Sequence, residues 1–206
     1  MAEQPRSRFR VRIDPSDLAV EIVSILLALI LATALNEWRE HVQERRSASD
    51  ALVQIRAEIV ANRAQLARNR PLHVRIARTF GRFTDARDER LTFDEFRRSF
   101  GAAAPHGILP FRGEETAWSL ARSSGAVSHV GYRTRVALEE AYREQAFTDE
   151  HTRRLLENFR FGPVAGTPNF YYVAFSFALD MNDLVYAESG LDAAYAKALG
   201  AIDHGH

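Results

Sequence analysis

The sequence predicts an all-α fold, in which one N-terminal transmembrane helix continues into a long stalk helix that packs with a small helical bundle. Three observations support this prediction. An apolar run, LAVEIVSILLALILATAL, covers residues 18–35 and contains one charged residue, Glu21. Residues 36–70 contain neither Pro nor Gly, so a helix that begins in the apolar run can continue through them. No segment shows the alternation of apolar and polar residues that is typical of a half-buried strand.

The apolar run has the properties of a membrane-spanning helix. From Leu18 to Leu35 a helix would be about 27 Å long, which is close to the thickness of a thin hydrocarbon core. Glu21 lies one turn inside the run, where a carboxylate reaches the lipid headgroups at modest cost. Trp38 follows the other end, and an indole is favoured at the membrane surface. We therefore expect a lipid bilayer as the first partner of this chain.

Two other interpretations of residues 18–35 remain open. A cleaved signal peptide is the first, because Ala32-Thr33-Ala34 matches the small-x-small cleavage pattern and arginines precede the run. The acidic residues Asp14, Asp17 and Glu21 count against it. A buried core helix is the second, but a helix that is apolar on every side needs a large host domain.

The arginines on either side of the run indicate its orientation. Four of them precede it, at positions 6, 8, 10 and 12, and three follow it within residues 36–55, at positions 39, 45 and 46. This bias predicts a cytoplasmic segment at 1–17 and a periplasmic C-terminal domain in a bacterial inner membrane, with a single pass. Among the 27 basic residues Lys197 is the only lysine, which is typical of a GC-rich bacterial genome.

The stalk helix is expected at 36–70 and to end or kink at Pro71. It carries a heptad-like stripe with alternating spacings of three and four residues, formed by Leu52, Ile55, Ile59, Asn62 and Leu66. Two interpretations of this stripe stay open. It either packs against later helices of the same chain or pairs with a second subunit or another membrane protein. In the second case Asn62 and Asn69 would set the register of the pairing.

Residues 71–206 are predicted to form a helical domain. Thr92-Phe-Asp-Glu95 matches a capping box and marks the start of a short helix. The stretches 101–113 and 161–169 are rich in Gly and Pro and predict loops. The remaining helices are expected at residues 72–87, 114–124, 132–159, 170–186 and 191–202.

Composition and motifs argue against several classes of function. The 27 basic and 27 acidic residues balance, whereas a nucleic-acid-binding protein would show a basic excess. Without cysteine the chain has no disulfide, thiolate metal site or cysteine nucleophile. Its seven histidines form neither an HExxH motif nor an i,i+4 pair. Because no nucleophile, base and orienting group can be named together, we predict neither a catalytic residue nor a cofactor, and no enzyme activity.

Short motifs resemble a known family. Asn36-Glu37-Trp38 follows the apolar run, Glu58 and Asn62 lie on the next helix, and the segment 116–142 reads TAWSLARSSGAVSHVGYRTRVALEEAY. In these features the chain resembles a family of uncharacterised bacterial single-span membrane proteins with an all-helical domain of unknown function. The resemblance implies one anchor and one helical domain, and it carries no catalytic residues.

These expectations favour a membrane-anchored helical interaction or scaffold protein. The heptad-like stalk joined to an anchor is the main reason. The alternative is a ligand-sensing helical bundle tethered to the membrane, with a pocket near Trp118, Tyr171 and Tyr172.

Overall fold

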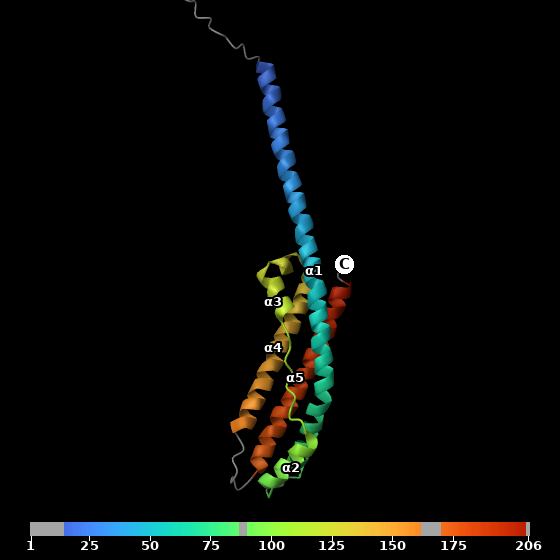
Figure 1. Ribbon diagram of the computed structural model, residues 1–206, viewed down its shortest axis with the longest axis vertical. Helices are drawn as coiled ribbons and strands as arrows, with labels where there is room; N and C mark the ends of the chain where they lie inside the picture. The colour runs from blue at the N-terminus through green and yellow to red at the C-terminus, as the bar shows by residue number, and fades with distance from the viewer. Residues whose placement is uncertain (1–14, 87–89, 162–169, 205–206) are drawn as a thin grey trace, which may run out of the picture. The chain divides into compact units, whose positions relative to one another are not determined.

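The computed structural model describes the backbone of residues 15–86, 90–161 and 170–204, and the side chains of 23–86, 90–158 and 170–204. Within these ranges all regular structure is helical (Figure 1). The elements are α1 (Pro15–Asp85), α2 (Phe93–Ala103), α3 (Thr116–Ser123), a single 3₁₀ turn η1 (Ala126–His129), α4 (Tyr132–Phe161) and α5 (Tyr171–His204). The predicted all-α class is confirmed for the described residues.

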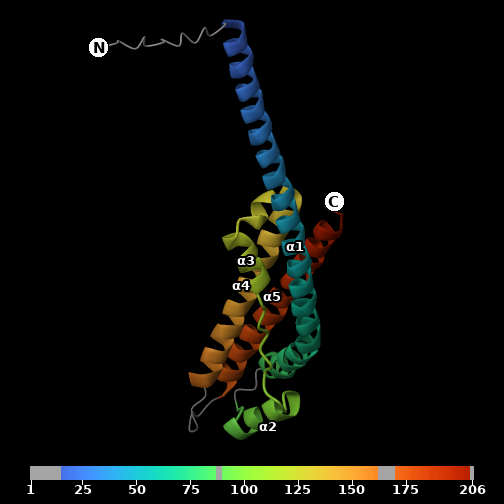
Figure 2. The same cartoon turned by 45° about the horizontal axis from the view of Figure 1, so that its top comes forward.

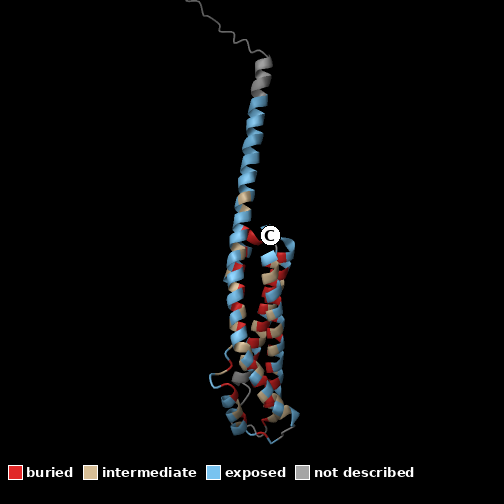
Figure 3. Cartoon of the chain, turned by 90° about the vertical axis from the view of Figure 1, so that its right-hand side faces the viewer, coloured by how far each residue is buried: buried red, intermediate tan, exposed pale blue. Residues whose placement is uncertain are grey.

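The chain divides into two compact units, Met1–Arg46 and Ser47–His206, and α1 has residues in both. In the first unit, the large apolar side chains between Val23 and Leu35 are exposed. Figure 3 marks this part of α1 as exposed. Residues 18–22 of the apolar run, including Leu18 and Glu21, lie outside the described side chains. Among the residues that the structure describes, no helix is both long enough and apolar enough to cross a membrane.

In the second unit the long helices α1, α4 and α5 form a bundle. Residues 47–85 of α1 lie beside α5, and α4 lies beside α5 as well (Figures 1 and 2). Both pairs are antiparallel, as their side-chain links show. Arg56 and Arg63 of α1 bind Asp203 and Asp192 of α5. The hydroxyl of Thr134, near the start of α4, donates to the Ala201 carbonyl, near the end of α5.

The core of this unit consists of two apolar clusters. One surrounds Ile59, Leu66 and Tyr195, and it contains Trp118 and Leu138. The other is rich in phenylalanine, where the ring of Phe80 lies 4.9 Å from those of Phe96 and Phe177. Buried residues accordingly gather on the facing sides of the helices in Figure 3.

The helix α2 begins as the sequence predicts. Glu95 N–H donates to the Thr92 hydroxyl, and Thr92 N–H donates to the Glu95 carboxylate, so the capping box is confirmed. Beyond α2 an extended segment, residues 104–115, returns along the bundle to α3 (Figure 1). This segment supplies much of the candidate site.

Two predicted helix boundaries differ in the structure. Of the two outcomes expected at Pro71, an end or a kink, the helix does not end there, because α1 continues to Asp85 and includes most of the separate helix expected at 72–87. Proline removes one helical hydrogen bond but does not prevent the rest, and Figure 2 shows α1 bending toward its C-terminal end. The expected helices 170–186 and 191–202 are one helix, α5. Gly190 lies inside it, since burial of Leu184 and Leu191 outweighs the low helix propensity of glycine.

Candidate functional site

The heptad-like stripe of α1 lies inside the bundle. Ile55 and Ile59 are 0% exposed and Leu66 is 1% exposed, and all three pack in the cluster that contains Trp118 and Tyr195. Leu52 packs against the same cluster. These side chains contact other helices of the same chain, so the stripe is part of the core of the bundle. A second subunit would reach them only if the bundle opened, so of the two interpretations of the stripe, packing within the chain fits the structure.

The asparagines of the stripe bind the extended segment. Asn62 is 3% exposed and pairs with both backbone groups of Glu114: its Nδ2 donates to the carbonyl at 2.7 Å, and its Oδ1 accepts from the N–H at 2.9 Å. Asn69 Nδ2 donates to the Leu109 carbonyl at 3.0 Å. These amides replace the partners that an extended backbone would otherwise lack. They do not set the register of a coiled coil, which corrects that expectation.

Gln145 of α4 extends the network around Asn62. Its Oε1 accepts from the Tyr195 hydroxyl at 2.6 Å and from Asn62 at 3.2 Å. Burial raises the pKa of Tyr195 well above its ordinary value. Gly113 passes so close that a Cβ at this position would lie 2.4 Å from Gln145 Cδ, which explains why the segment has glycine there. The network joins α1, α4, α5 and the extended segment.

Glu58 forms a second polar centre one turn away. Its carboxylate accepts from the Ala117 N–H at 2.7 Å, at the start of α3, and from the Tyr142 hydroxyl at 2.6 Å. A carboxylate at a helix N-terminus binds unpaired N–H groups and complements the helix dipole. Burial and the neighbouring Glu58 raise the pKa of Tyr142 above its ordinary range. Tyr142 in turn stacks on Trp118, with ring centroids 5.0 Å apart.

The third centre is a buried pair, His73 and Glu188, both 0% exposed. His73 Nδ1 lies 2.6 Å from Glu188 Oε1, and His73 Nε2 lies 2.6 Å from the Ile108 carbonyl. Burial lowers the pKa of His73, but the hydrogen bond and charge of Glu188 outweigh it, so the pKa lies above its ordinary value. Glu188 Oε2 and Arg70 Nε are buried without a hydrogen-bond partner. This pair fastens the extended segment to α1 and α5.

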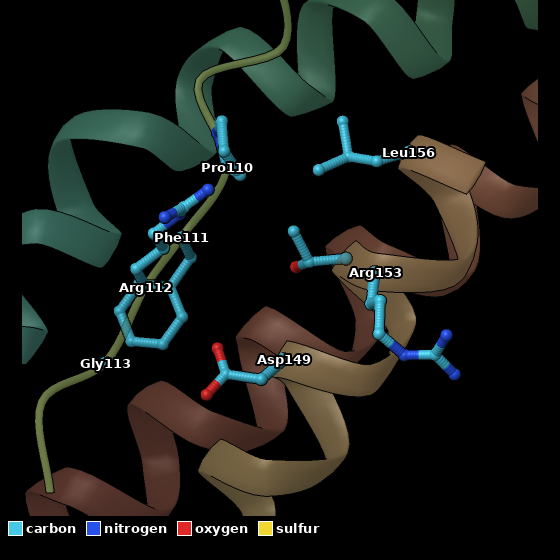
Figure 4. A pocket seen from close by; sticks show the side chains of 8 residues that line it. Pro110, Phe111, Arg112, Gly113, Asp149, Arg153 and Leu156 are labelled. Carbon is cyan, nitrogen blue, oxygen red and sulfur yellow. The ribbon is translucent and has the colours of Figure 1, made fainter. Parts of the chain in front are cut away.

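A groove lies where the extended segment passes α4. Its volume is about 250 Å³, and Figure 4 shows the Asp149 carboxylate turned toward the segment at Gly113. Burial raises the pKa of Asp149 to about 6; the Gly113 N–H acts to lower this pKa, and the charge of Glu115 acts to raise it. Arg153 lines the same groove, but its guanidinium binds Glu150 and Glu157. A neighbouring hollow of about 380 Å³ shares Gly113, Asp149 and Arg153.

The residues predicted for a pocket lie elsewhere. Trp118 is 3% exposed and packed in the core. Tyr171 and Tyr172 lie at the start of α5, and Tyr172 is 69% exposed. None of the three lines the groove at Asp149. The sequence did not indicate Asp149 or the pair of His73 and Glu188. A single acid or histidine in a helix carries no signal about a distant neighbour, and His73 and Glu188 are 115 positions apart.

The described residues contain no group of three or more histidine or acidic side chains that could hold a metal ion. The polar networks bind the extended segment to α1, α4 and α5 and hold it in place, which is a structural role. Comparisons of the chain with protein-family models, curated proteins and solved structures find no match. The resemblance to the single-span family stays a prediction.

Proposed function

We propose that this chain is a membrane-anchored helical interaction or scaffold protein, with residues 18–35 as its transmembrane helix. One observation carries the proposal. The large apolar side chains from Val23 to Leu35 are each more than half exposed, and positions 25, 26, 27, 31 and 35 together point to all sides of a helix. A helix that exposes apolar side chains on every side is favoured in lipid, where its backbone groups are already paired.

Further features support the anchor. Glu21 is the one charged residue of the run, and it lies near the end where a carboxylate can reach the headgroups. Trp38 is 63% exposed, as a side chain at the membrane surface would be. With arginines at 6, 8, 10 and 12 inside the cytoplasm, the domain that begins at Ser47 lies in the periplasm of a bacterium.

An interaction role follows from what the domain contains. Most of the buried polar groups described above bind one another, and the surface includes large exposed apolar side chains on α4 and α5, among them Tyr132, Phe147, Tyr172 and Tyr186. Such side chains are enriched where proteins bind one another. A protein partner fits these features better than a chemical reaction.

Membrane anchoring is tested by extraction at high pH. Wild-type protein should stay in the pellet after carbonate treatment, and the double variant Leu27→Arg/Leu31→Arg should be released, because each central arginine costs about 2.5–3.5 kcal/mol of insertion free energy. A matched control, Gln54→Arg/Ala61→Arg, places the same charges at exposed positions of α1 outside the run. Release of wild-type protein by carbonate would refute the anchor.

Orientation and cleavage need a second measurement. Because the chain has no cysteine, Ser49→Cys at an exposed position introduces a single thiol. In intact spheroplasts this thiol should react with a membrane-impermeant maleimide, whereas Ser7→Cys should react only after lysis. Mass spectrometry of the membrane-extracted protein should find residues 18–35 still present. A chain that begins near Leu35 would show a cleaved signal peptide instead.

The groove at Asp149 favours a second candidate function, a ligand-sensing bundle tethered to the membrane. A half-buried carboxyl with a pKa of about 6, beside Phe111 and Leu156, combines an apolar wall with one titratable group. A ligand of this groove should change the titration of the Asp149 carboxyl carbon in NMR spectra. If small molecules extracted from a bacterial lysate leave that titration unchanged, the interaction role stands alone.

A further inference from the structure

The exposed face of α5 carries a second heptad stripe, which we call the aromatic stripe. Its members follow spacings of three and four residues: Tyr172, Phe175, Leu179, Asn182 and Tyr186. Four of them are large apolar side chains that are 39–80% exposed. This is the pattern of a helix that packs against another helix, with one polar position that can set register.

The charge around the aromatic stripe is acidic. Between Phe161 and Ala196 the chain contains neither Lys nor Arg, although it has 27 basic residues in all. The same stretch contains Asp180, Asp183, Glu188 and Asp192. Glu188 is buried beside His73 and Asp192 binds Arg63, so the exposed acidic charge at this face is that of Asp183. A helix with an exposed arginine level with Asp183 would therefore complement this face.

The chain itself offers such a helix. Between Ile59 and Thr84 of α1 there is no acidic residue, and an exposed stripe with the same spacing contains Arg68, Pro71, Arg75, Arg78 and Arg82. We call it the arginine stripe. Both stripes span fourteen residue steps, or about 21 Å of helix. Arginine also binds well over aromatic rings, which the aromatic stripe supplies.

We propose that the domain forms a parallel homodimer in which the arginine stripe of each copy packs on the aromatic stripe of the other. Contacts within one chain show which residues of the two stripes lie at the same level along the helix axes. His73 binds Glu188 across the antiparallel helices α1 and α5, so five residues further along α1, Arg78 lies level with Asp183. Rotation about a two-fold axis parallel to the helices does not move a residue along that axis. Arg78 of one copy therefore lies level with Asp183 of the second copy.

This arrangement is isologous, because each chain uses both stripes and the two contacts are equivalent. The two-fold axis also leaves both copies pointing the same way, as two chains in one bilayer must. That parallel orientation rests on the proposed membrane anchor, which in turn raises the local concentration of the chains. The contact between the two stripes involves residues of the helical domain alone and does not depend on the anchor.

Charge reversal tests the pairing in the full-length protein in lipid nanodiscs. Wild type should have the mass of two chains by light scattering. Arg78→Glu should dissociate, because the introduced carboxylate then faces Asp183 of the second copy, and Asp183→Arg should dissociate because two guanidinium groups meet. We expect each to raise the dimer dissociation constant by about tenfold or more, since like charges facing across an interface are strongly unfavourable. Arg133→Glu, an exposed charge reversal on α4, should leave the dimer intact.

Mixing the two variants gives the decisive result. In an equimolar mixture the introduced carboxylate of one variant faces the introduced guanidinium of the other. At the second, equivalent contact the native Arg78 faces the native Asp183, so a heterodimer should form with the affinity of wild type. Circular dichroism of each variant alone confirms that the domain is folded.

Two results overturn the proposal: a wild-type protein with the mass of one chain, or a mixture of the two variants that stays monomeric. Carbonate extraction of Arg78→Glu reports separately on the anchor, which should be unaffected. Failure of the dimer and failure of the proposed anchor are therefore distinguishable.

Discussion

The two most apolar stretches of this chain have opposite exposure. In residues 23–35 every large apolar side chain is exposed, whereas in residues 170–181 the side chains of Phe170, Phe177 and Met181 are at most 4% exposed. The second stretch lies at the start of α5, and its buried side chains pack with Phe80 and Phe96. Apolar composition alone therefore does not decide burial. A stretch with one apolar and one polar face packs at the surface of a bundle, whereas a helix that is apolar on all sides is typical of a large protein core or a membrane.

The largest expected effect compares the two stretches directly. Phe177→Ala removes a ring that meets Phe80 edge-on at 4.9 Å, and it should lower the free energy of unfolding by about 3–5 kcal/mol. Leu27→Ala should change it by about 0.5 kcal/mol or less, because Leu27 is 56% exposed. Urea unfolding of both variants in one mild detergent, followed by circular dichroism, measures the difference. Equal losses would mean that residues 23–35 also belong to a packed core.

Polar groups sharpen the comparison, because the fully buried carboxylate of this domain, Glu188, lies beside a histidine. Glu188→Ala leaves His73 buried without its partner and should lower the free energy of unfolding by about 3 kcal/mol or more. The double variant His73→Leu/Glu188→Leu should be more stable than Glu188→Ala, since it leaves no buried charge. A double variant less stable than the single one would contradict this account of the pair.

The contribution of the pair of His73 and Glu188 to the stability of the domain should depend on pH. The pKa of His73 is raised in the folded chain, so its stabilising contribution is complete below the ordinary histidine pKa of about 6.5. It is lost as pH rises through the raised value. Thermal unfolding across this window should therefore show that wild type loses stability and that the double leucine variant does not.

A smaller effect is expected at Asp149, on the boundary between buried and exposed. Its pKa is about 6 in the folded chain and about 3.9 when unfolded, so the fold binds a proton that the unfolded chain releases. The stabilising contribution of this proton is complete below about pH 4 and is lost as pH rises through 6. Asp149→Asn should remove this slope and raise stability at neutral pH by about 1 kcal/mol or less, as thermal unfolding at several pH values would show. An unchanged slope would place the proton on another group.

Much of the helical architecture could be predicted from local sequence. Thr92 and Glu95 form the capping box because both partners lie within one turn. The start of α4 at Tyr132 also agrees with the predicted helix. Pro71 misled the prediction, since its cost of one hydrogen bond is smaller than what burial of Ile76 and Phe80 on the same helix contributes.

The sequence by itself determined that the chain is helical, that residues 18–35 are apolar on all sides, and that its charges balance. These properties depend on composition and on spacings within a few turns. The tertiary structure decided that Asn62 and Asn69 bind residues 109–114, that His73 meets Glu188, and that Ile55 and Ile59 are core while Phe175 and Leu179 stay exposed. A heptad pattern shows that a helix has a partner, but which helix provides it depends on how distant segments pack.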